Sequence, residues 1–471
     1  MVTYQDFEKT NERDRAKFIA RLIREHEASP EFKIALDANE YDRQKNTTIC
    51  NFVQKVFTAS GSEIENVVAS NNKRASNLFR RLNVQRCTYS LGNGVTFEEE
   101  GLKEKLGVDF DTKLKTAAYK ALIHGVSFVF FNVDHIHVFP LTEFAPLYDE
   151  MTGALRAGVR YWRLDVKRPC TAVLYEEDGY TVYVAKHTSD YVETEAKRAY
   201  KQTVSKAEAD LESVIVGEEN YTSLPIVPLW GSEVHQSTLV GLKDGIDNYD
   251  LISNGWCNDL SDCAQIYWLI ENYGGMSEAD RANFRARLMY QHIAGVDTQD
   301  GSKVTPYTQE VPFAAREAYL NMLRRDIYAD FGALDVTNIS ASAKTATEIN
   351  AAYQPLDENA DDFEYQIIDC VQHILALIGT EATPLFKRNR ITNQLEQVEL
   401  LNIEAGMVEL DNETLLNKFP NFTPDEVQDV LDRIVEEQAK RVNNAPPSPV
   451  STPVEEEEEP EQPQDGETVN A

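Results

Sequence analysis

The sequence predicts an α+β fold that is mainly helical, and three observations favour this class. Runs of β-branched and aromatic residues gather between positions 126 and 230, which is typical of strands. From position 237 onward, apolar residues recur every three or four positions over long segments, which is typical of helices. The chain has 471 residues, of which 42% are hydrophobic and 26% charged. That length and composition suffice for several cores, in about two to four domains.

The N-terminal region is predicted to be largely helical. Residues 6–23 carry apolar side chains at helical spacing among many charges, so we expect a partly exposed amphipathic helix. Residues 51–57 and 62–82 are predicted as two further helices. Residues 114–124 are predicted as another helix, which ends at Gly125.

The period of the apolar residues changes at position 126, and strands are predicted from there. Two of these strands flank Glu176-Glu177-Asp178-Gly179, which predicts a hairpin turn. Residues 191–219 are polar and charged and are predicted as an exposed excursion, and residues 220–230 close the β region. The predicted strands are 126–133, 135–139, 159–165, 171–175 and 181–185.

A long helix is predicted from residue 237 to about residue 270. Three glycines within it each cost up to about 1 kcal/mol relative to alanine, so tertiary or subunit packing must support it. One face is apolar and the other is acidic, with Lys243 as the nearby base. Such a helix needs a partner on its apolar face and tolerates water on the other. The acidic residues are Asp244, Asp247, Asp250, Asp259 and Asp262.

Two further helices are predicted after a compact insertion. Residues 313–331 form a helix that Gly332 stops. Residues 346–378 form a second long helix, which Pro355 should kink or break near Tyr353. The insertion before these helices contains a basic helix with Arg281, Arg285 and Arg287.

The remaining segments are a polar loop and a C-terminal region. Residues 333–345 are small and polar and predict a mobile loop. Beyond Pro384, a β-like pair is predicted at 385–390 and 397–401, followed by two short helices. From residue 445 the chain is rich in Pro, Ser, Glu and Gln, a composition that predicts a disordered tail.

The charge of the chain disfavours ordinary DNA binding. Lys and Arg number 46 against 78 Asp and Glu, which gives a formal charge of −32. Phosphate binding needs clustered Lys and Arg, so a chain this acidic repels duplex DNA unless a local patch reverses the sign. Passage of DNA without tight binding is compatible with this charge.

The cysteines and the hydropathy indicate a protein made in the cytoplasm. The six cysteines form no CxxC pair and show no zinc-ligand spacing, so we expect reduced thiols. The first fourteen residues are polar and do not resemble a signal peptide. The apolar runs are far shorter than the roughly 20 residues needed to span a bilayer, so no membrane partner is expected.

The sequence motifs of common enzymes are absent. We find no GxxxxGK[ST], HExxH, GxSxG or GxGxxG. His135 and His137 share a strand face and could ligate a metal, but a half-exposed strand is the favoured interpretation. The acidic helix is interpreted as a solvated face rather than a cation site. We therefore expect no catalytic residues, no metal and no cofactor.

Several local stretches stand in a characteristic order. They are His135–Val138 followed by Leu141–Asp149, then Leu155–Trp162, then Leu224–Trp230 followed by Gly245–Asp250 and Asn258–Leu260. Their order and spacing, over roughly residues 20–440, resemble the portal proteins of tailed bacteriophages, in the branch typical of siphophages infecting Gram-positive hosts. No single stretch is diagnostic by itself.

The resemblance implies a division of the chain into the parts of a portal subunit. It implies that the two long helices of the stem bracket the clip, and that a tunnel loop follows the second of them. The implied parts are a wing (1–236), a first stem helix (237–265), a clip (266–312), a second stem helix (313–332), a tunnel loop (333–345), a kinked helix of wing and crown (346–380), a crown (381–441) and an acidic tail (442–471).

The resemblance also implies a function and partners. Portal proteins of this kind form a ring, dodecameric in particles, at one capsid vertex of the virion, and double-stranded DNA passes through it during packaging and ejection. The implied partners are further copies of the chain, the terminase large subunit, a head–tail adaptor, and the major capsid and scaffolding proteins. Assembly is expected in the host cytoplasm.

Three sets of residues are candidates for the functional surfaces. The aspartates of the first stem helix are predicted to line the channel, where they would repel DNA weakly over about 8–10 Å. The three arginines of the clip are either a docking surface for partner proteins or a solvated helix face, with equal weight. The predicted DNA-facing residues of the tunnel loop are Asn338, Ser340, Ser342, Lys344 and Thr345.

Two features qualify this assignment. The Ser-Gly segment usual in the family before the next helix is replaced by Ser340-Ala341-Ser342-Ala343-Lys344, which leaves the register of the tunnel loop open. The alternative functions are another virion or connector protein without a DNA channel, and a cellular enzyme with dispersed catalytic residues. A pair of long helices bracketing residues 266–312 distinguishes the portal from the first alternative.

Overall fold

The computed structural model describes most of the chain up to residue 390. The described residues are 2–57, 61–66, 70–99, 101–165, 167–185, 190–205, 214–263, 267–270, 277–280, 282–283, 304–307, 313–336, 346–390, 403, 416, 427 and 430–434. The chain divides into two units, Met1–Asn389 and Arg390–Ala471. In the second unit the described residues 403, 416, 427 and 430–434 are helical.

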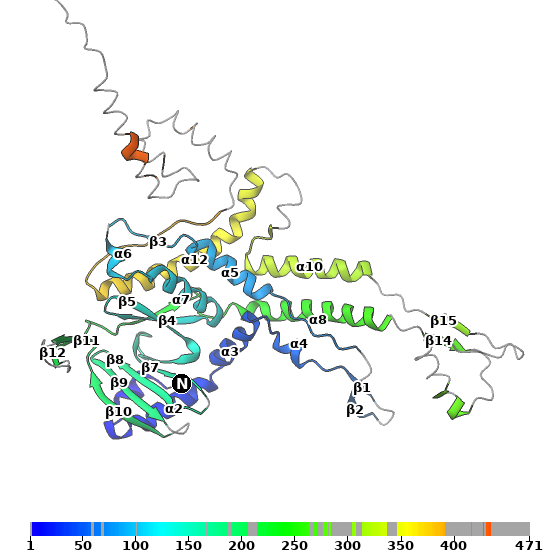
Figure 1. Ribbon diagram of the computed structural model, residues 1–471, viewed down its shortest axis with the longest axis horizontal. Coiled ribbons are helices and arrows are strands. Elements are labelled where there is room, and N and C mark those ends of the chain that lie inside the picture. The colour runs from blue at the N-terminus through cyan, green and yellow to red at the C-terminus, as the bar shows by residue number, and fades with distance from the viewer. Residues whose placement is uncertain are drawn as a thin grey trace, which may run out of the picture. The chain divides into compact units, whose positions relative to one another are not determined.

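The first unit mixes helices and strands, which confirms the predicted α+β class (Figure 1). Its helices are α1 (Tyr4–Glu8), α2 (Arg15–Ala28), α3 (Pro30–Asp42), α4 (Thr47–Asn51), α5 (Leu78–Leu91), α6 (Leu102–Lys105), α7 (Phe110–His124), α8 (Leu239–Cys263), α10 (Phe313–Phe331) and α12 (Ala346–Leu377), with short 3-10 turns at Glu12–Asp14 and Leu141–Glu143.

The strands form one large sheet, one small sheet and several two-stranded ribbons. Strands β6 to β10 make a five-stranded antiparallel meander, and β13-β4-β5 make a three-stranded sheet. The two-stranded pairs are β1-β2, β11-β12, β14-β15 and β16-β3. The bounds are β1 (Lys55–Phe57), β2 (Glu63–Glu65), β3 (Val95–Thr96), β4 (Val126–Asn132), β5 (His135–Pro140), β6 (Phe144–Tyr148), β7 (Leu155–Trp162), β8 (Cys170–Glu176), β9 (Gly179–Ala185), β10 (Tyr191–Arg198), β11 (Lys201–Ser205), β12 (Val214–Glu219), β13 (Ile226–Trp230), β14 (Tyr267–Ile270), β15 (Val304–Tyr307) and β16 (Leu385–Phe386).

The main core lies around the three-stranded sheet. The middle strand β4 is buried over six of its residues, as its β-branched and aromatic composition predicts. Helix α7 packs on this sheet and α12 contacts β13. The rings of Phe128 and Phe144 lie 4.4 Å apart and join this sheet to the large one. A second core forms where α2 covers the large sheet with Ile19 and Leu22.

Local signals place the ends of several elements. Ser29 accepts a hydrogen bond from the Phe32 N–H at 3.2 Å and caps α3, whose first residue is a proline. Gly125 ends α7 with φ +88°, and a Cβ there would lie 2.9 Å from the backbone of Gln236. Strands β8 and β9 pair from Glu176 opposite Gly179, which confirms the predicted hairpin.

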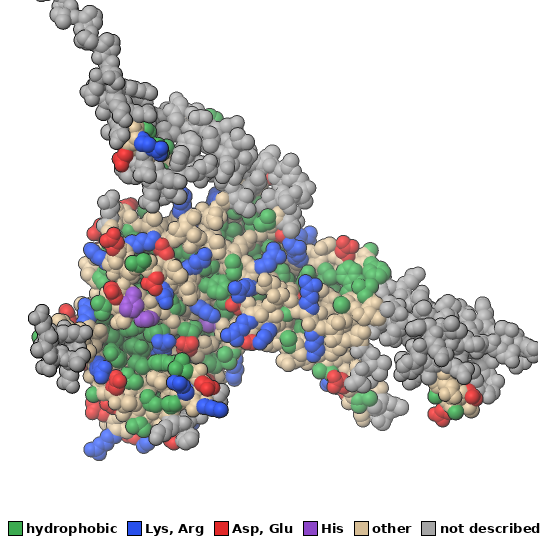
Figure 2. Space-filling model, viewed as in Figure 1, with side chains coloured by type: hydrophobic (Ala, Val, Ile, Leu, Met, Phe, Trp, Pro, Cys, Tyr) green, Lys and Arg blue, Asp and Glu red, His purple; other side chains and the backbone are tan. Residues whose placement is uncertain are grey.

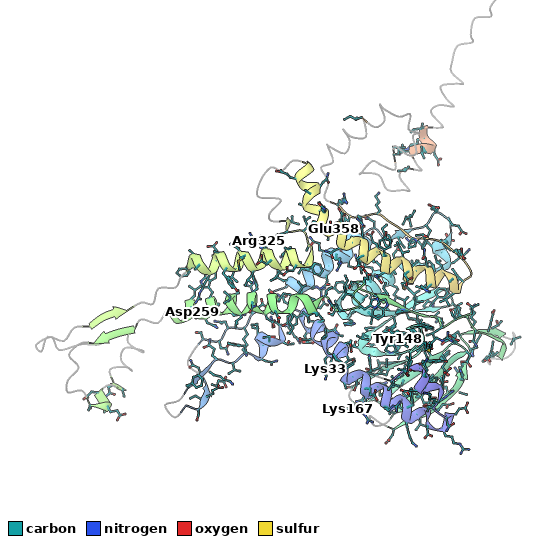
Figure 3. The ribbon with its side chains drawn as sticks, turned by 180° about the vertical axis from the view of Figure 1, so that it is seen from behind. Lys33, Tyr148, Lys167, Asp259, Arg325 and Glu358 are labelled. Atoms are coloured by element: carbon teal, nitrogen blue, oxygen red, sulfur yellow. The ribbon has the colours of Figure 1, made fainter. Side chains whose placement is uncertain are left out.

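Helix α12 is bent rather than broken. It contains Pro355 and continues as a helix through it. Figure 3 shows its direction changing close to Glu358, three residues after the proline. The predicted kink is therefore confirmed, and it is expected because proline removes one backbone hydrogen bond and crowds the preceding turn.

Two predictions for secondary structure are wrong. Residues 55–57 and 63–65 form the hairpin β1-β2 rather than helices, with Val56 opposite Ile64, and the next helix begins only at Leu78. Residues 63–65 alternate as Glu-Ile-Glu, and residues 55–57 include the β-branched Val56 and the aromatic Phe57, so strand preference outweighs the helical spacing of the wider window. Residues 191–219, where no strand was predicted, contain strands β10, β11 and β12, although most of their described side chains are exposed, as expected.

The predicted C-terminal β pair is tested only in its first strand. Leu385 and Phe386 do form a strand, but it pairs with Thr96 and Val95 of β3. Residues 397–401 lie outside the described residues. A strand of two residues finds its partner by tertiary proximity, which the local sequence pattern does not contain.

Candidate functional site

Helices α8 and α10 form a closely packed pair (Figure 1). Gly245 of α8 faces Ile327 of α10, and a Cβ at Gly245 would lie 3.2 Å from that side chain. Further along, Arg316 forms an ion pair with Asp259, and the rings of Trp256 and Phe313 lie 6.2 Å apart. The pair of long helices predicted on either side of residues 266–312 is thus confirmed, and β14 and β15 pair with each other just beyond it.

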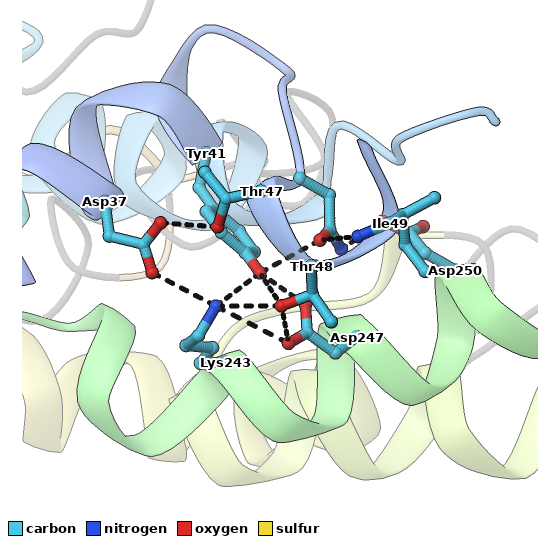
Figure 4. Close-up of polar contacts among 9 residues, drawn as sticks. Asp37, Tyr41, Thr47, Thr48, Ile49, Lys243, Asp247 and Asp250 are labelled. Carbon is cyan, nitrogen blue, oxygen red and sulfur yellow. Dashed lines mark hydrogen bonds and ion pairs between the residues drawn. The ribbon is translucent and has the colours of Figure 1, made fainter. Parts of the chain in front are cut away.

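A row of polar side chains on α8 fastens the preceding part of the chain to this helix. Lys243 begins the row (Figure 4). Its ammonium group lies 3.1 Å from the carboxylate of Asp37 and donates hydrogen bonds to the hydroxyls of Tyr41 at 2.7 Å and Thr48 at 3.2 Å. The Tyr41 hydroxyl in turn donates to Asp247. Helices α3 and α4 are therefore held against α8.

The surroundings of Lys243 favour its charged form. Burial by itself would lower the pKa of this amine, but the hydrogen bonds with Tyr41 and Asp37 outweigh burial and raise the pKa. Burial, followed by the bond to Asp247, raises the pKa of Tyr41. A protonated lysine and a protonated tyrosine are the forms that satisfy all of these contacts at neutral pH.

Asp250 is the next residue of this row, and it is buried. Its side chain is buried, with the whole residue only 2% exposed. One carboxylate oxygen accepts a hydrogen bond from the Asn46 amide at 2.9 Å, and the other accepts from the Ser76 N–H at 3.0 Å. Burial raises the pKa of Asp250 even though these hydrogen bonds act in the opposite direction.

Two asparagines complete the row. Asn254 accepts from the Arg74 N–H and donates to the Arg74 carbonyl, both at 2.8 Å. Asn258 accepts from the backbone N–H of Asn72 at 2.7 Å and from its side chain at 2.9 Å. The extended segment that includes Asn72 and Arg74 is thereby laid along α8 by paired backbone contacts.

The sequence reasoning missed this role, although a signal for it exists. Lys243, Asp247, Asp250, Asn254 and Asn258 follow one another at steps of four, three, four and four residues, which places them on one helix face. An amine, carboxylates and amides on one helix face supply both donors and acceptors. Such a face is suited to hydrogen bonding with the backbone of another segment, and not only with water.

The structure therefore reduces the number of α8 aspartates that can line a channel. For Asp250 it is wrong, because this carboxylate lies in the interior of the subunit. Asp247 is 16% exposed and engaged with Lys243. Asp244 is exposed, and Asp259 is partly exposed while paired with Arg316. Asp262 lies in α8, and its side chain is outside the described residues.

Two other sets of predicted site residues lie outside the described part of the chain. They are the tunnel-loop residues Asn338, Ser340, Ser342, Lys344 and Thr345, and the clip arginines Arg281, Arg285 and Arg287. Their roles stay predictions.

His135 and His137 face each other on β5. Their Nε2 atoms lie 3.0 Å apart, and the Nδ1 atom of His135 lies 2.7 Å from the Asp134 carboxylate. Burial and the neighbouring His135 lower the pKa of His137. Over the described residues, no group of three or more His, Cys, Asp or Glu side chains is placed to hold a metal ion.

Apolar side chains remain exposed on the helix pair. Figure 2 shows hydrophobic side chains at the outer end of α10. Beside them is a cavity of about 410 Å³, lined by α8, α10 and the segments on either side of the β1-β2 hairpin. In the part of the chain that the structure describes, no helix has the length and apolar character to cross a membrane. The exposed apolar side chains of this pair include Leu251, Leu260, Phe313, Tyr319 and Met322.

Comparison with known proteins gives consistent matches. A family model described as "Phage portal protein, SPP1 Gp6-like" matches residues 10–443. The portal protein of Clostridium phage phiCD119 is 23% identical over 380 residues, covering 73% of this chain and 81% of the relative. The portal protein of Bacillus phage SPP1 is 24% identical over 455 residues, covering 89% of this chain and 86% of the relative.

Solved structures also match at low identity. One is described as the neck of a native GTA particle computed with C12 symmetry, with a TM-score of 0.42, 11% identity, and coverage of 73% of this chain and 89% of that chain. Another is the virion of a native gene transfer agent particle, with a TM-score of 0.43, 11% identity, and coverage of 72% and 88%.

Proposed function

This chain belongs to the phage portal protein family, SPP1 Gp6-like, and on that premise we propose that it forms a ring through which double-stranded DNA passes. The ring would occupy one capsid vertex of the virion, where genome packaging and ejection both use it. The proposed role is structural, and no catalytic activity is assigned.

The observation that carries the proposal is the helix pair α8–α10 with its unburied apolar side chains. Its inner ends are packed in a shared core by Leu242 and Ile246 from α8 and by Ile327 and Phe331 from α10. Its outer part exposes Leu251, Phe313 and other apolar groups to solvent in the isolated subunit. Exposed patches of this kind mark association surfaces.

A ring uses such a surface in a particular way. In a head-to-tail ring each subunit offers one surface to the neighbour before it and a different one to the neighbour after it. Under the proposal α8 and α10 form the stem, residues 266–312 the clip and residues 333–345 the tunnel loop. Residues 1–236 form the wing, residues 381–441 the crown and residues 442–471 an acidic tail.

The net charge of the chain fits the passage of DNA. With a formal charge of −32 the subunit repels duplex DNA at short range, which permits passage without retention. Asp244 and Asp259 are the described aspartates of α8 that keep solvent contact and are therefore proposed to contribute to the lining. Lys344 is proposed to touch phosphates transiently.

The proposed partners follow from the same ring. They are the terminase large subunit, a head–tail adaptor, and the major capsid and scaffolding proteins, with assembly in the host cytoplasm. The alternative is a connector component without a DNA channel.

Electron microscopy of the purified full-length chain tests the ring. Particles with a central hole wide enough for duplex DNA support the proposal, and class averages give the number of subunits, expected to be 12 in particles. Monodisperse monomers at every concentration, measured by light scattering, contradict it. Rings that close without a hole favour the alternative connector.

A further inference from the structure

The β1-β2 hairpin, which we call the arm, has no core of its own. It consists of two three-residue strands. Phe57 in β1 is 75% exposed and Ile64 in β2 is 50% exposed. An isolated two-stranded hairpin is at best marginally stable in water, so an arm with exposed apolar side chains is expected to be covered by another surface.

Side-chain hydrogen bonds fasten the base of the arm. Gln54 donates to the Ser70 carbonyl at 3.2 Å, and the returning segment is held on α8 by Asn254 and Asn258. Beyond this base the ribbon of the arm diverges from α8 (Figures 1 and 3). The base is thus positioned by the stem, while Phe57 is exposed and belongs to none of the described hydrophobic cores.

The cavity beside α8 and α10 is a suitable receptor for Phe57. It measures about 410 Å³, and its walls include the apolar side chains of Leu251, Ile252 and Tyr319. Pockets of a few hundred Å³ with mainly apolar walls bind aromatic groups well. Tyr319 and Leu251 are themselves 41% and 39% exposed, so an inserted ring would cover them further.

We propose that Phe57, the last residue of strand β1 in the arm, inserts into the cavity between α8 and α10 of a second copy of this chain. This contact rests on the proposed ring and would join adjacent subunits within it. The arm and the cavity are different surfaces of one chain, so repeated insertion is head-to-tail and closes a ring if the rotation fits.

Charge complementarity selects a second copy as the occupant. On the arm, Lys55 pairs with Glu63 at 2.9 Å, which leaves Glu65 as an additional negative charge. At the cavity, Lys73 donates to the Cys50 carbonyl at 2.7 Å, and no carboxylate among the described residues forms an ion pair with it. An acidic arm therefore meets a basic cavity edge.

The arm is long enough for this contact. Extended chain rises about 3.3 Å per residue, so the segment 52–57 reaches roughly 20 Å from its base. A helix with its side chains is about 10–12 Å wide. Phe57 can thus cross the width of one stem helix to reach an adjacent subunit.

Cysteine cross-linking between two singly substituted chains tests the proposal. One chain carries Phe57→Cys and the other Tyr319→Cys, both with Cys50, Cys257 and Cys263 replaced by Ser. After mixing, reassembly and mild oxidation, non-reducing gels should show covalent dimers in the mixture at a yield at least about tenfold above either chain alone. A matched control pairs Met151→Cys, also highly exposed at 91%, with Tyr319→Cys.

Three outcomes separate this contact from the ring itself. Rings by electron microscopy without dimers in the mixture overturn the arm contact and leave the ring intact. A doubly substituted chain that instead forms an internal bridge also overturns it, because the arm then folds onto its own cavity. Monomers at every concentration overturn the proposed ring and the contact together.

Substitutions give an independent readout. Phe57→Ser should raise the concentration needed for half-assembly by about tenfold or more, whereas Met151→Ser should leave it unchanged. Glu65→Lys should weaken assembly, and Lys73→Glu in the same chain should restore it. Unchanged assembly of Phe57→Ser contradicts the proposal.

Discussion

The carboxylate of Asp250 accepts a hydrogen bond at 2.9 Å from the side-chain amide of Asn46, which lies 204 positions earlier in the chain. Through this contact and those of Lys243, Asn254 and Asn258, one face of α8 binds the preceding part of the chain. These polar side chains of α8, which the sequence pattern assigns to solvent, thus hold two parts of the fold together.

Replacing Asp250 with Ala should destabilise the subunit. The change leaves the Asn46 amide and the Ser76 N–H buried without their acceptor, which costs about 1–3 kcal/mol. Urea unfolding followed by circular dichroism measures the loss. Asp244→Ala, at an exposed position of the same helix, is the matched control and should change the free energy of unfolding by less than about 0.5 kcal/mol.

The glycines of α8 should respond differently to alanine. A Cβ at Gly241 meets no heavy atom within 4 Å, so Gly241→Ala should stabilise the subunit by about 0.5–1 kcal/mol through helix propensity. A Cβ at Gly245 lies 3.2 Å from Ile327, so Gly245→Ala should lose this gain. Thermal unfolding compares the two variants, and equal stabilisation would show that Ile327 moves aside freely.

Ile327 and Leu323 should behave differently when replaced with Asp. Ile327 is 2% exposed in the core at the base of the helix pair, so Ile327→Asp should unfold this region, and loss of rings in that variant says nothing specific about subunit contacts. Leu323 is only half-buried and is the better probe. Leu323→Asp should keep a cooperative unfolding transition while assembly falls, as light scattering would measure.

Stability should fall as the pH decreases from about 6.5 to about 4. Burial lowers the pKa of His26 to about 4, and burial followed by Lys120 lowers that of His124 to about 3. In this window the unfolded histidines bind protons that the folded ones do not, so each histidine costs about 1.4 kcal/mol per pH unit. Urea midpoints measured from pH 7 to 4 test this, and a His124→Gln variant should show a shallower slope.

Asp244→Lys tests the proposed channel surface without altering the fold. A positive charge at this exposed site should retain phosphates and slow DNA translocation, since each added contact strengthens binding in a salt-dependent way. An in vitro packaging assay over a range of salt concentrations measures the effect. Glu31→Lys, at an exposed position of α3, is the control for total charge. Equal slowing by both variants would show that Asp244 does not line the channel.

Several elements follow from the sequence because short-range physics determines them. Helix α10 runs from Phe313 to Phe331 as its four-residue spacing predicts, and Gly332, with φ +64°, ends it. The hairpin between Glu176 and Gly179 follows from turn-forming residues between two β-rich runs. The order of such elements along the chain was also enough to indicate the portal family, which the family model confirms over residues 10–443.

What lies opposite each helix face was decided only by the tertiary structure. Helical periodicity shows that Lys243, Asp247 and Asp250 share a face, but not whether water, DNA or another segment covers it. The segment that does cover it comes from residues 37–76, and its backbone N–H groups and carbonyls need partners once water is removed. For that reason Asp250, which the sequence predicted to line the channel together with other aspartates, is instead buried in the interior of the fold.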